Sequence, residues 1–240
     1  MMVIFDLDDT LLDHSGAVQA AILEFYRSHK VLQRISEEEF LYHWHKESER
    51  FYQLYLQGKY SFKDQRIYRV KSIFAMVGKE IDDERAWVYF SEYLKYYQNN
   101  WRCFSDVDGC LRSLQGRYRL GILSNGDGEQ QRNKLNCMGL YGKFDLMVFS
   151  GDVGVAKPSP EIFQVLLKKA GLSPEQVVYV GDDLKTDILA AIEVGINGIL
   201  IDRKGRYKET IEQMDEVNFK VTGSLERIPD IVDSFLRAER

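Results

Sequence analysis

The chain has 240 residues, 45% of them hydrophobic and 29% charged, which is the composition of an ordinary soluble globular protein. Its formal net charge of −5 favours neither nucleic acid nor an anionic membrane as a partner, and no apolar run reaches the roughly 18 residues of a membrane span. Three cysteines without C-x-x-C spacing favour reduced thiols over a disulfide framework or a zinc site, so we expect a soluble cytoplasmic protein.

The first predicted element is a short buried strand that ends in acidic residues. The apolar run Val3–Phe5 stops at Asp6, and Asp8 and Thr10 follow at every second position. Alternate side chains of an extended chain share a face, so the two carboxylates are expected to point the same way. Like charges at the end of a buried strand are costly unless a cation or a shared proton compensates them. We therefore interpret this stretch as a functional site.

A helical pattern follows, with no strand within residues 15–101. Ser36 and Ser61 precede two of the helical runs, and Asp82 or Asp83 precedes another; these are residue types typical of helix N-caps. Four helices in succession predict a small helical bundle that forms a unit of its own.

From residue 104 onward, strands alternate with helices. The predicted strands are Leu120–Leu123, Leu146–Phe149, Val177–Val180, Gly198–Ile201 and Phe219–Val221. The predicted helices are Val107–Leu114, Gln130–Met138, one that begins at Ser159-Pro160, Ile188–Val194 and Leu225–Leu236. This alternation predicts an α/β fold with a doubly wound parallel sheet, Rossmann-like, covered by helices on both faces. We assign residues 1–14 and 102–240 to this core, and residues 15–101 to an inserted α-helical cap domain.

Polar residues follow four of the predicted strands, and the carboxyl ends of parallel strands meet at one edge of a sheet. The four groups are Asp6-x-Asp8-x-Thr10, Ser124-Asn125, Gly154-x-x-Lys157-Pro158 and Gly181-Asp182-x-x-x-x-Asp187. In this order they resemble the motifs of the haloacid dehalogenase-like (HAD) hydrolases. The helical insertion resembles the C1-type cap of that superfamily. Residues 58–74 and 181–188 are similar to the pyrimidine 5′-nucleotidase and N-acylneuraminate-9-phosphatase branch.

A phosphate monoester would add about two negative charges to a site that already holds several carboxylates, and Mg²⁺ is the usual hard cation in such sites. We assign Asp6 and Asp182 as side-chain ligands of Mg²⁺. The resemblance implies the backbone carbonyl of Asp8 as a third ligand. We expect Asp187 to orient the site without binding the metal directly.

The remaining strand-end residues are expected to bind the phosphoryl group. Lys157 adds a positive charge for the phosphoryl oxygens and the nucleophile, and we count it as catalytic. The Ser124 hydroxyl and the turn at Asn125 offer hydrogen-bond donors to further oxygens. Thr10 is expected to buttress the turn that follows the first strand.

These roles predict a Mg²⁺-dependent phosphomonoesterase whose partner is a small phosphate ester, such as a nucleoside monophosphate or a sugar phosphate. Asp6 would attack phosphorus and form an aspartyl-phosphate, and Asp8 would serve as general acid and then general base. An acid at this position favours phosphate ester chemistry over dehalogenation, because a halide needs no proton to leave. A phosphomutase of the same fold and a non-enzymatic phospho-receiver remain alternatives.

Overall fold

The computed structural model describes residues 1–214 and 217–238; residues 215, 216, 239 and 240, which fall in the predicted core segment, lie outside it. The chain divides into two compact units, one formed by Met1–Asp13 with Arg102–Arg240 and the other by His14–Trp101. Each unit has a hydrophobic core of its own.

The first unit is built on a parallel sheet. Within the described residues, six strands pair in the order β3-β2-β1-β4-β5-β6, and all five pairings are parallel. The strands are β1 (Met2–Phe5), β2 (Arg119–Ser124), β3 (Leu146–Phe149), β4 (Val177–Gly181), β5 (Asn197–Ile201) and β6 (Lys220–Thr222). The chain builds outward from β1 on one side and then crosses to β4 on the other. The carboxyl ends of β1 and β4 therefore flank the point where such sheets bind ligands.

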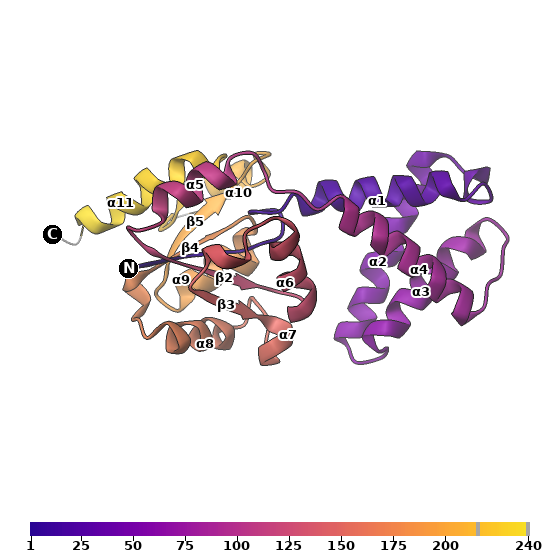
Figure 1. Cartoon of the computed structure of the whole chain (residues 1–240), viewed down its shortest axis with the longest axis horizontal. Coiled ribbons are helices and arrows are strands. Elements are labelled where there is room, and N and C mark those ends of the chain that lie inside the picture. The colour runs from indigo at the N-terminus through magenta and orange to yellow at the C-terminus, as the bar shows by residue number, and fades with distance from the viewer. Residues whose placement is uncertain (215–216, 239–240) are drawn as a thin grey trace. The chain divides into compact units, whose positions relative to one another are not determined.

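Helices cover both faces of this sheet, as expected because its middle strands β1 and β4 are buried along their whole length. They are α5 (Val107–Leu114), α6 (Gly128–Cys137), α7 (Ser150–Val153), α8 (Pro160–Ala170), α9 (Ala190–Glu193), α10 (Lys208–Glu212) and α11 (Ile228–Ala238). On one face, Ile162 and Phe163 of α8 share a core with Met2 and Ile4 of β1. On the other face, α5 and α11 lie side by side (Figure 1). The predicted doubly wound α/β fold is confirmed.

Most elements lie within two residues of their predicted bounds, and the clearest differences fall in the last third of the chain. The last strand is Lys220–Thr222, one residue later than predicted, and the last helix is preceded by a 3₁₀ turn at Leu225–Arg227. The helix predicted at Ile188–Val194 contains α9, and it begins earlier than predicted, with a π-helical turn over Leu184–Leu189. Asp187 lies in this turn. Such turns disrupt the regular helical ladder and occur often at functional sites.

The second unit consists of α1 (His14–Ser28), α2 (Glu37–Leu56), α3 (Phe62–Met76) and α4 (Asp83–Asn99). The predicted N-caps are confirmed, because the side chains of Ser36, Ser61 and Asp82 accept hydrogen bonds from backbone N–H groups three residues later, at 3.1, 3.0 and 2.8 Å. Aromatic side chains such as Phe25 and Trp44 fill its core. Across the described part of the chain, no helix combines the length and the apolar character needed to cross a bilayer.

Candidate active site

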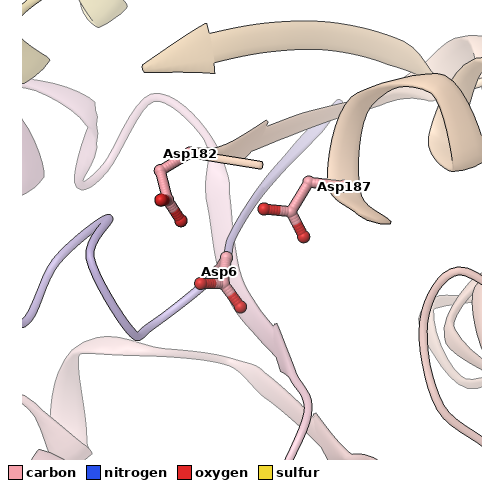
Figure 2. A group of neighbouring side chains, drawn as sticks. All are labelled: Asp6, Asp182 and Asp187. Atoms are coloured by element: carbon pink, nitrogen blue, oxygen red, sulfur yellow. The ribbon is translucent and has the colours of Figure 1, made fainter. Parts of the chain in front are cut away.

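Three carboxylates converge where β1 and β4 end. Asp6 directly follows β1, and its backbone N–H donates to the carbonyl of Val180 on the neighbouring β4 at 2.9 Å. Asp182 directly follows β4, and Asp187 comes from the π-helical turn behind it. One carboxylate oxygen from each of the three residues lies within 4.8 Å of the others. The three side chains converge in Figure 2. Gly181 permits this approach, because a side chain there would collide with the carboxylate of Asp187.

The ammonium group of Lys157 lies between two of these carboxylates. Its Nζ donates to Oδ1 of Asp6 and to Oδ1 of Asp187, both at 2.6 Å, and to the hydroxyl of Tyr179 at 2.8 Å. The Tyr179 hydroxyl donates in turn to the carbonyl of Leu123 at 3.0 Å. Burial by itself would lower the pKa of Lys157, but the carboxylates of Asp187 and Asp6 raise that pKa well above its ordinary value. Lys157 is therefore a fixed positive charge.

The same burial penalises the negative charges. Burial raises the pKa of Asp6 from 3.8 to about 8, with Asp187 and Asp8 adding to the rise and Lys157 opposing it. Burial, with the nearby Asp187, raises the pKa of Asp182 to about 6, although the Arg206 guanidinium opposes it. The single ammonium group of Lys157 does not balance the three carboxylates, so the cluster keeps an excess of negative charge. The donor set, three closely spaced carboxylates, fits a hard divalent cation such as Mg²⁺.

Helix α6 binds the carboxylate of Asp8. Lys134 Nζ donates to both carboxylate oxygens of Asp8, at 2.7 and 2.8 Å, and Gln131 Nε2 donates to Oδ2 at 3.1 Å. The chain turns immediately afterwards at Asp9, whose φ of 61° is left-handed. Aspartate is one of the few residues besides glycine that adopts this conformation readily. The role of the Asp8 carbonyl as a metal ligand stays a prediction.

Asn125 binds the loop that carries Lys157. Its Nδ2 donates to the carbonyl of Lys157, and its Oδ1 accepts from the N–H of the same residue, both at 2.9 Å. Its side chain therefore positions Lys157, and its predicted contact with phosphate stays a prediction. Ser124 is buried at the end of β2, and its hydroxyl accepts a hydrogen bond from Gln131 at 2.9 Å.

Thr10 connects the loop after β1 with the end of β4. Its buried hydroxyl donates to Oδ1 of Asp182 at 3.5 Å, and its carbonyl accepts from Arg203 at 3.1 Å. Arg206 also binds Asp182, at 2.8 Å from Oδ2. The hydroxyl of Thr10 thus reaches a predicted metal ligand, and its role as a buttress of the turn stays a prediction.

Sequence reasoning missed four residues that contact the site: Tyr179, Gln131, Lys134 and Arg206. Gln131 and Lys134 lie three residues apart and so share a helical face, but the sequence of this mostly polar helix does not mark that face as the inward one. Tyr179 lies inside a strand whose other residues are apolar, so only its hydroxyl distinguishes it.

Tyr179→Phe is expected to lower the free energy of unfolding by about 1–2 kcal/mol, because the carbonyl of Leu123 loses its buried donor and Lys157 loses an acceptor. Thermal or urea denaturation measures this loss. Tyr141→Phe, which removes the same hydroxyl from an exposed ring, serves as the control. Equal stability of the two variants would contradict a structural role for the Tyr179 hydroxyl.

Comparison with known proteins places this arrangement in a family. The model of the family described as haloacid dehalogenase-like hydrolase matches residues 1–195. The chain belongs to this family. The predicted resemblance to HAD hydrolases and the prediction of an enzyme are therefore confirmed, and the phospho-receiver alternative is set aside.

Two curated relatives of this HAD hydrolase are phosphatases by name. It is 38% identical over 102 residues to glyceraldehyde 3-phosphate phosphatase of Methanothermobacter thermautotrophicus, a match that covers 42% of the chain and 45% of that protein. It is 27% identical to N-acylneuraminate-9-phosphatase of Mus musculus, over 97% of the chain and 93% of the relative. The chain thus spans less than half of the first relative and nearly all of the second.

Solved structures that carry different functional names share the fold of this HAD hydrolase. YfnB of Bacillus subtilis, described as a HAD-hydrolase bound to magnesium, aligns with a TM-score of 0.76 at 20% identity, covering 97% of this chain and 98% of that one. L-2-haloacid dehalogenase of Xanthobacter autotrophicus aligns with a TM-score of 0.69 at 20% identity and the same coverage. At such identity the likeness shows the fold alone, so the reaction has to be argued from the side chains.

Proposed function

We propose that this HAD hydrolase is a Mg²⁺-dependent phosphomonoesterase that passes the phosphoryl group of a small ester to Asp6 and then to water. The observation that carries the proposal is the buried carboxylate of Asp6, which directly follows the central strand and lies 2.6 Å from Lys157 within a group of three carboxylates. The phosphatases among its relatives support a phosphate ester as the substrate.

Two positive charges, a bound Mg²⁺ ion and the ammonium group of Lys157, would stabilise the phosphoryl group. Asp6 and Asp182 would hold Mg²⁺, together with the backbone carbonyl of Asp8. When bound, the ion would neutralise charge on the phosphoryl oxygens. Lys157 supplies the second charge from the protein itself and is held in place by Asp187 and the Asn125 side chain.

The side chains divide the reaction into two displacements. In the first, an oxygen of Asp6 attacks phosphorus in line while the ester oxygen leaves and takes a proton from Asp8, giving the free alcohol and an aspartyl-phosphate. In the second, Asp8 accepts a proton from water as the water oxygen attacks phosphorus, which releases inorganic phosphate and restores Asp6. The proton relay is needed because an alkoxide is a poor leaving group.

The substrate class is a sugar phosphate or a nucleoside monophosphate. The whole-length match to N-acylneuraminate-9-phosphatase supports the sugar phosphate. We assign residues 15–101, inserted after the nucleophile and its acid/base partner, as the cap domain that selects among these esters.

A panel of sugar phosphates, nucleoside monophosphates and p-nitrophenyl phosphate tests the proposal, with phosphate release measured in Mg²⁺ and in EDTA. Release that requires Mg²⁺ is the expected result. Appearance of an isomerised sugar phosphate in place of free phosphate would indicate the phosphomutase alternative. No turnover of any ester would overturn the proposal.

The metal-free protein is expected to lose stability as the pH rises from about 5 to about 8. The pKa of Asp6 rises from 3.8 to about 8 on folding, so between these values the folded state holds a proton that the unfolded state lacks. The contribution of Asp6 to the free energy of unfolding is therefore fully present below pH 3.8 and is lost as the pH rises through about 8. Because Mg²⁺ competes with the proton, the gain in Tm on adding Mg²⁺ should be larger at the higher pH.

Thermal unfolding of the wild type and of Asp6→Asn, each in EDTA and in Mg²⁺, isolates this effect from other titrating groups. The difference in Tm between the metal-free proteins should grow with pH, because the variant carries no charge at this position. A difference independent of pH would contradict the burial of an ionisable Asp6.

A further inference from the structure

Helix α6 presents two buried polar side chains toward the loop after β1. Gln131 and Lys134 lie three residues apart, and so share one face of the helix. Their exposed fractions are 1% and 3%. A lysine is seldom buried to this extent unless it is paired, so the partner of Lys134 identifies its role.

That partner is the acid/base residue of the proposed mechanism. The two contacts of Lys134 Nζ, at 2.7 and 2.8 Å, involve both carboxylate oxygens of Asp8. Gln131 Nε2 lies 3.1 Å from Oδ2 of Asp8, 2.9 Å from the hydroxyl of Ser124 and 3.1 Å from the carbonyl of Asn125. One amide thus connects the carboxylate of Asp8 with the end of β2.

We propose that Lys134 and Gln131 are positioning residues for proton transfer: Lys134 fixes the carboxylate of Asp8, and Gln131 ties that carboxylate to Ser124. This inference rests on the proposed function and adds two residues to it. A general acid has to lie within hydrogen-bond reach of the leaving oxygen, and small displacements of a catalytic group are costly. The Asp8 side chain is 27% exposed and follows a strand end, so it needs partners that restrict its torsions.

A role in proton transfer can be separated from a role in folding by the choice of leaving group. An alkyl phosphate releases a strongly basic alkoxide and depends on the acid, whereas p-nitrophenyl phosphate releases a weakly basic phenolate and depends on it little. The value of kcat/KM reports steps up to departure of the alcohol, and so excludes hydrolysis of the aspartyl-phosphate, which both esters share. A fold defect would lower kcat/KM for both esters alike.

For Lys134→Met, we expect kcat/KM to fall about 10²-fold for the alkyl phosphate and less than about threefold for p-nitrophenyl phosphate. Lys134→Arg keeps a cation and is expected to restore part of the loss. Gln131→Leu is expected to show the same selectivity with a smaller amplitude. Arg132→Met removes a cation from the same helix, one that pairs with Asp152 at the surface, and should leave the ratio of the two kcat/KM values unchanged.

If Lys134→Met alone folds poorly, a double variant still tests the inference. Asp8→Ala with Lys134→Met removes both charges together, so no unpaired charge stays buried. If Lys134 acts through Asp8, the double variant should lose no more kcat/KM for the alkyl phosphate than Asp8→Ala alone. An additive loss, or equal losses on both esters from Lys134→Met, would overturn the inference.

Other outcomes would overturn the proposed function itself: a wild type that releases no phosphate, or an Asp8→Ala variant whose kcat/KM falls equally for both esters. An active wild type with a selective Asp8→Ala and an unselective Lys134→Met would overturn the positioning role alone.

Discussion

Asp6→Asn is expected to lower turnover by about 10⁴-fold or more, because an amide oxygen is too weak a nucleophile to form the phosphoryl-enzyme. The same change should raise the Tm of the metal-free protein near pH 8, since it removes a buried negative charge beside Asp187 while Lys157 keeps one carboxylate partner. Loss of activity with a gain in stability is typical of a group retained for chemistry.

Steady-state phosphate release and thermal unfolding of the same preparation measure both effects. Asp230→Asn makes the same chemical change at the exposed start of α11 and should alter neither. More than a trace of activity in Asp6→Asn would show that the nucleophile is wrongly assigned.

Lys157→Met is expected to lower turnover about 10³-fold, comparable with the removal of one donor that stabilises a developing negative charge. It should also lower the free energy of unfolding by about 3–5 kcal/mol, because the carboxylates of Asp6 and Asp187 stay buried without their cation. The destabilisation should increase with pH as the buried Asp6 carboxyl, whose pKa is raised to about 8, loses its proton.

A second substitution separates the two effects. Lys157→Met combined with Asp187→Asn removes one of the stranded charges and should recover part of the stability without recovering turnover. Lys168→Met, on an exposed position of α8, is the matched lysine control. Recovery of turnover in the double variant would contradict a direct role of Lys157 at the phosphoryl group.

The convergence of distant residues was predictable, because it follows from topology. Asp6 and Asp182 are far apart in the chain, yet each directly follows a parallel strand, and adjacent parallel strands end at one edge. The strands themselves were readable from short apolar runs bounded by polar residues. The helical unit was readable from N-cap residues whose hydrogen bonds the structure contains.

Contacts that depend on which face of a helix points inward were not predictable in the same way. Helix α6 is polar on most of its surface, so its sequence does not mark the face that carries Gln131 and Lys134 inward. The amide of Asn125 could bind a ligand or the backbone, and only the position of the Lys157 loop decides between them. Asp187 directly precedes the helix predicted at Ile188–Val194, and the structure places it in a π-helical turn, where two backbone N–H groups share the carbonyl of Asp183.

The central claim is that hydrolysis proceeds in two displacements through Asp6, and the stereochemistry at phosphorus tests it most directly. Each in-line displacement inverts the configuration at phosphorus. With a phosphorothioate ester whose phosphorus is chiral by sulfur and two oxygen isotopes, turned over in water of the third isotope, two displacements should give inorganic thiophosphate with retained configuration. Inverted configuration would mean that water attacks the substrate directly, and would contradict the account.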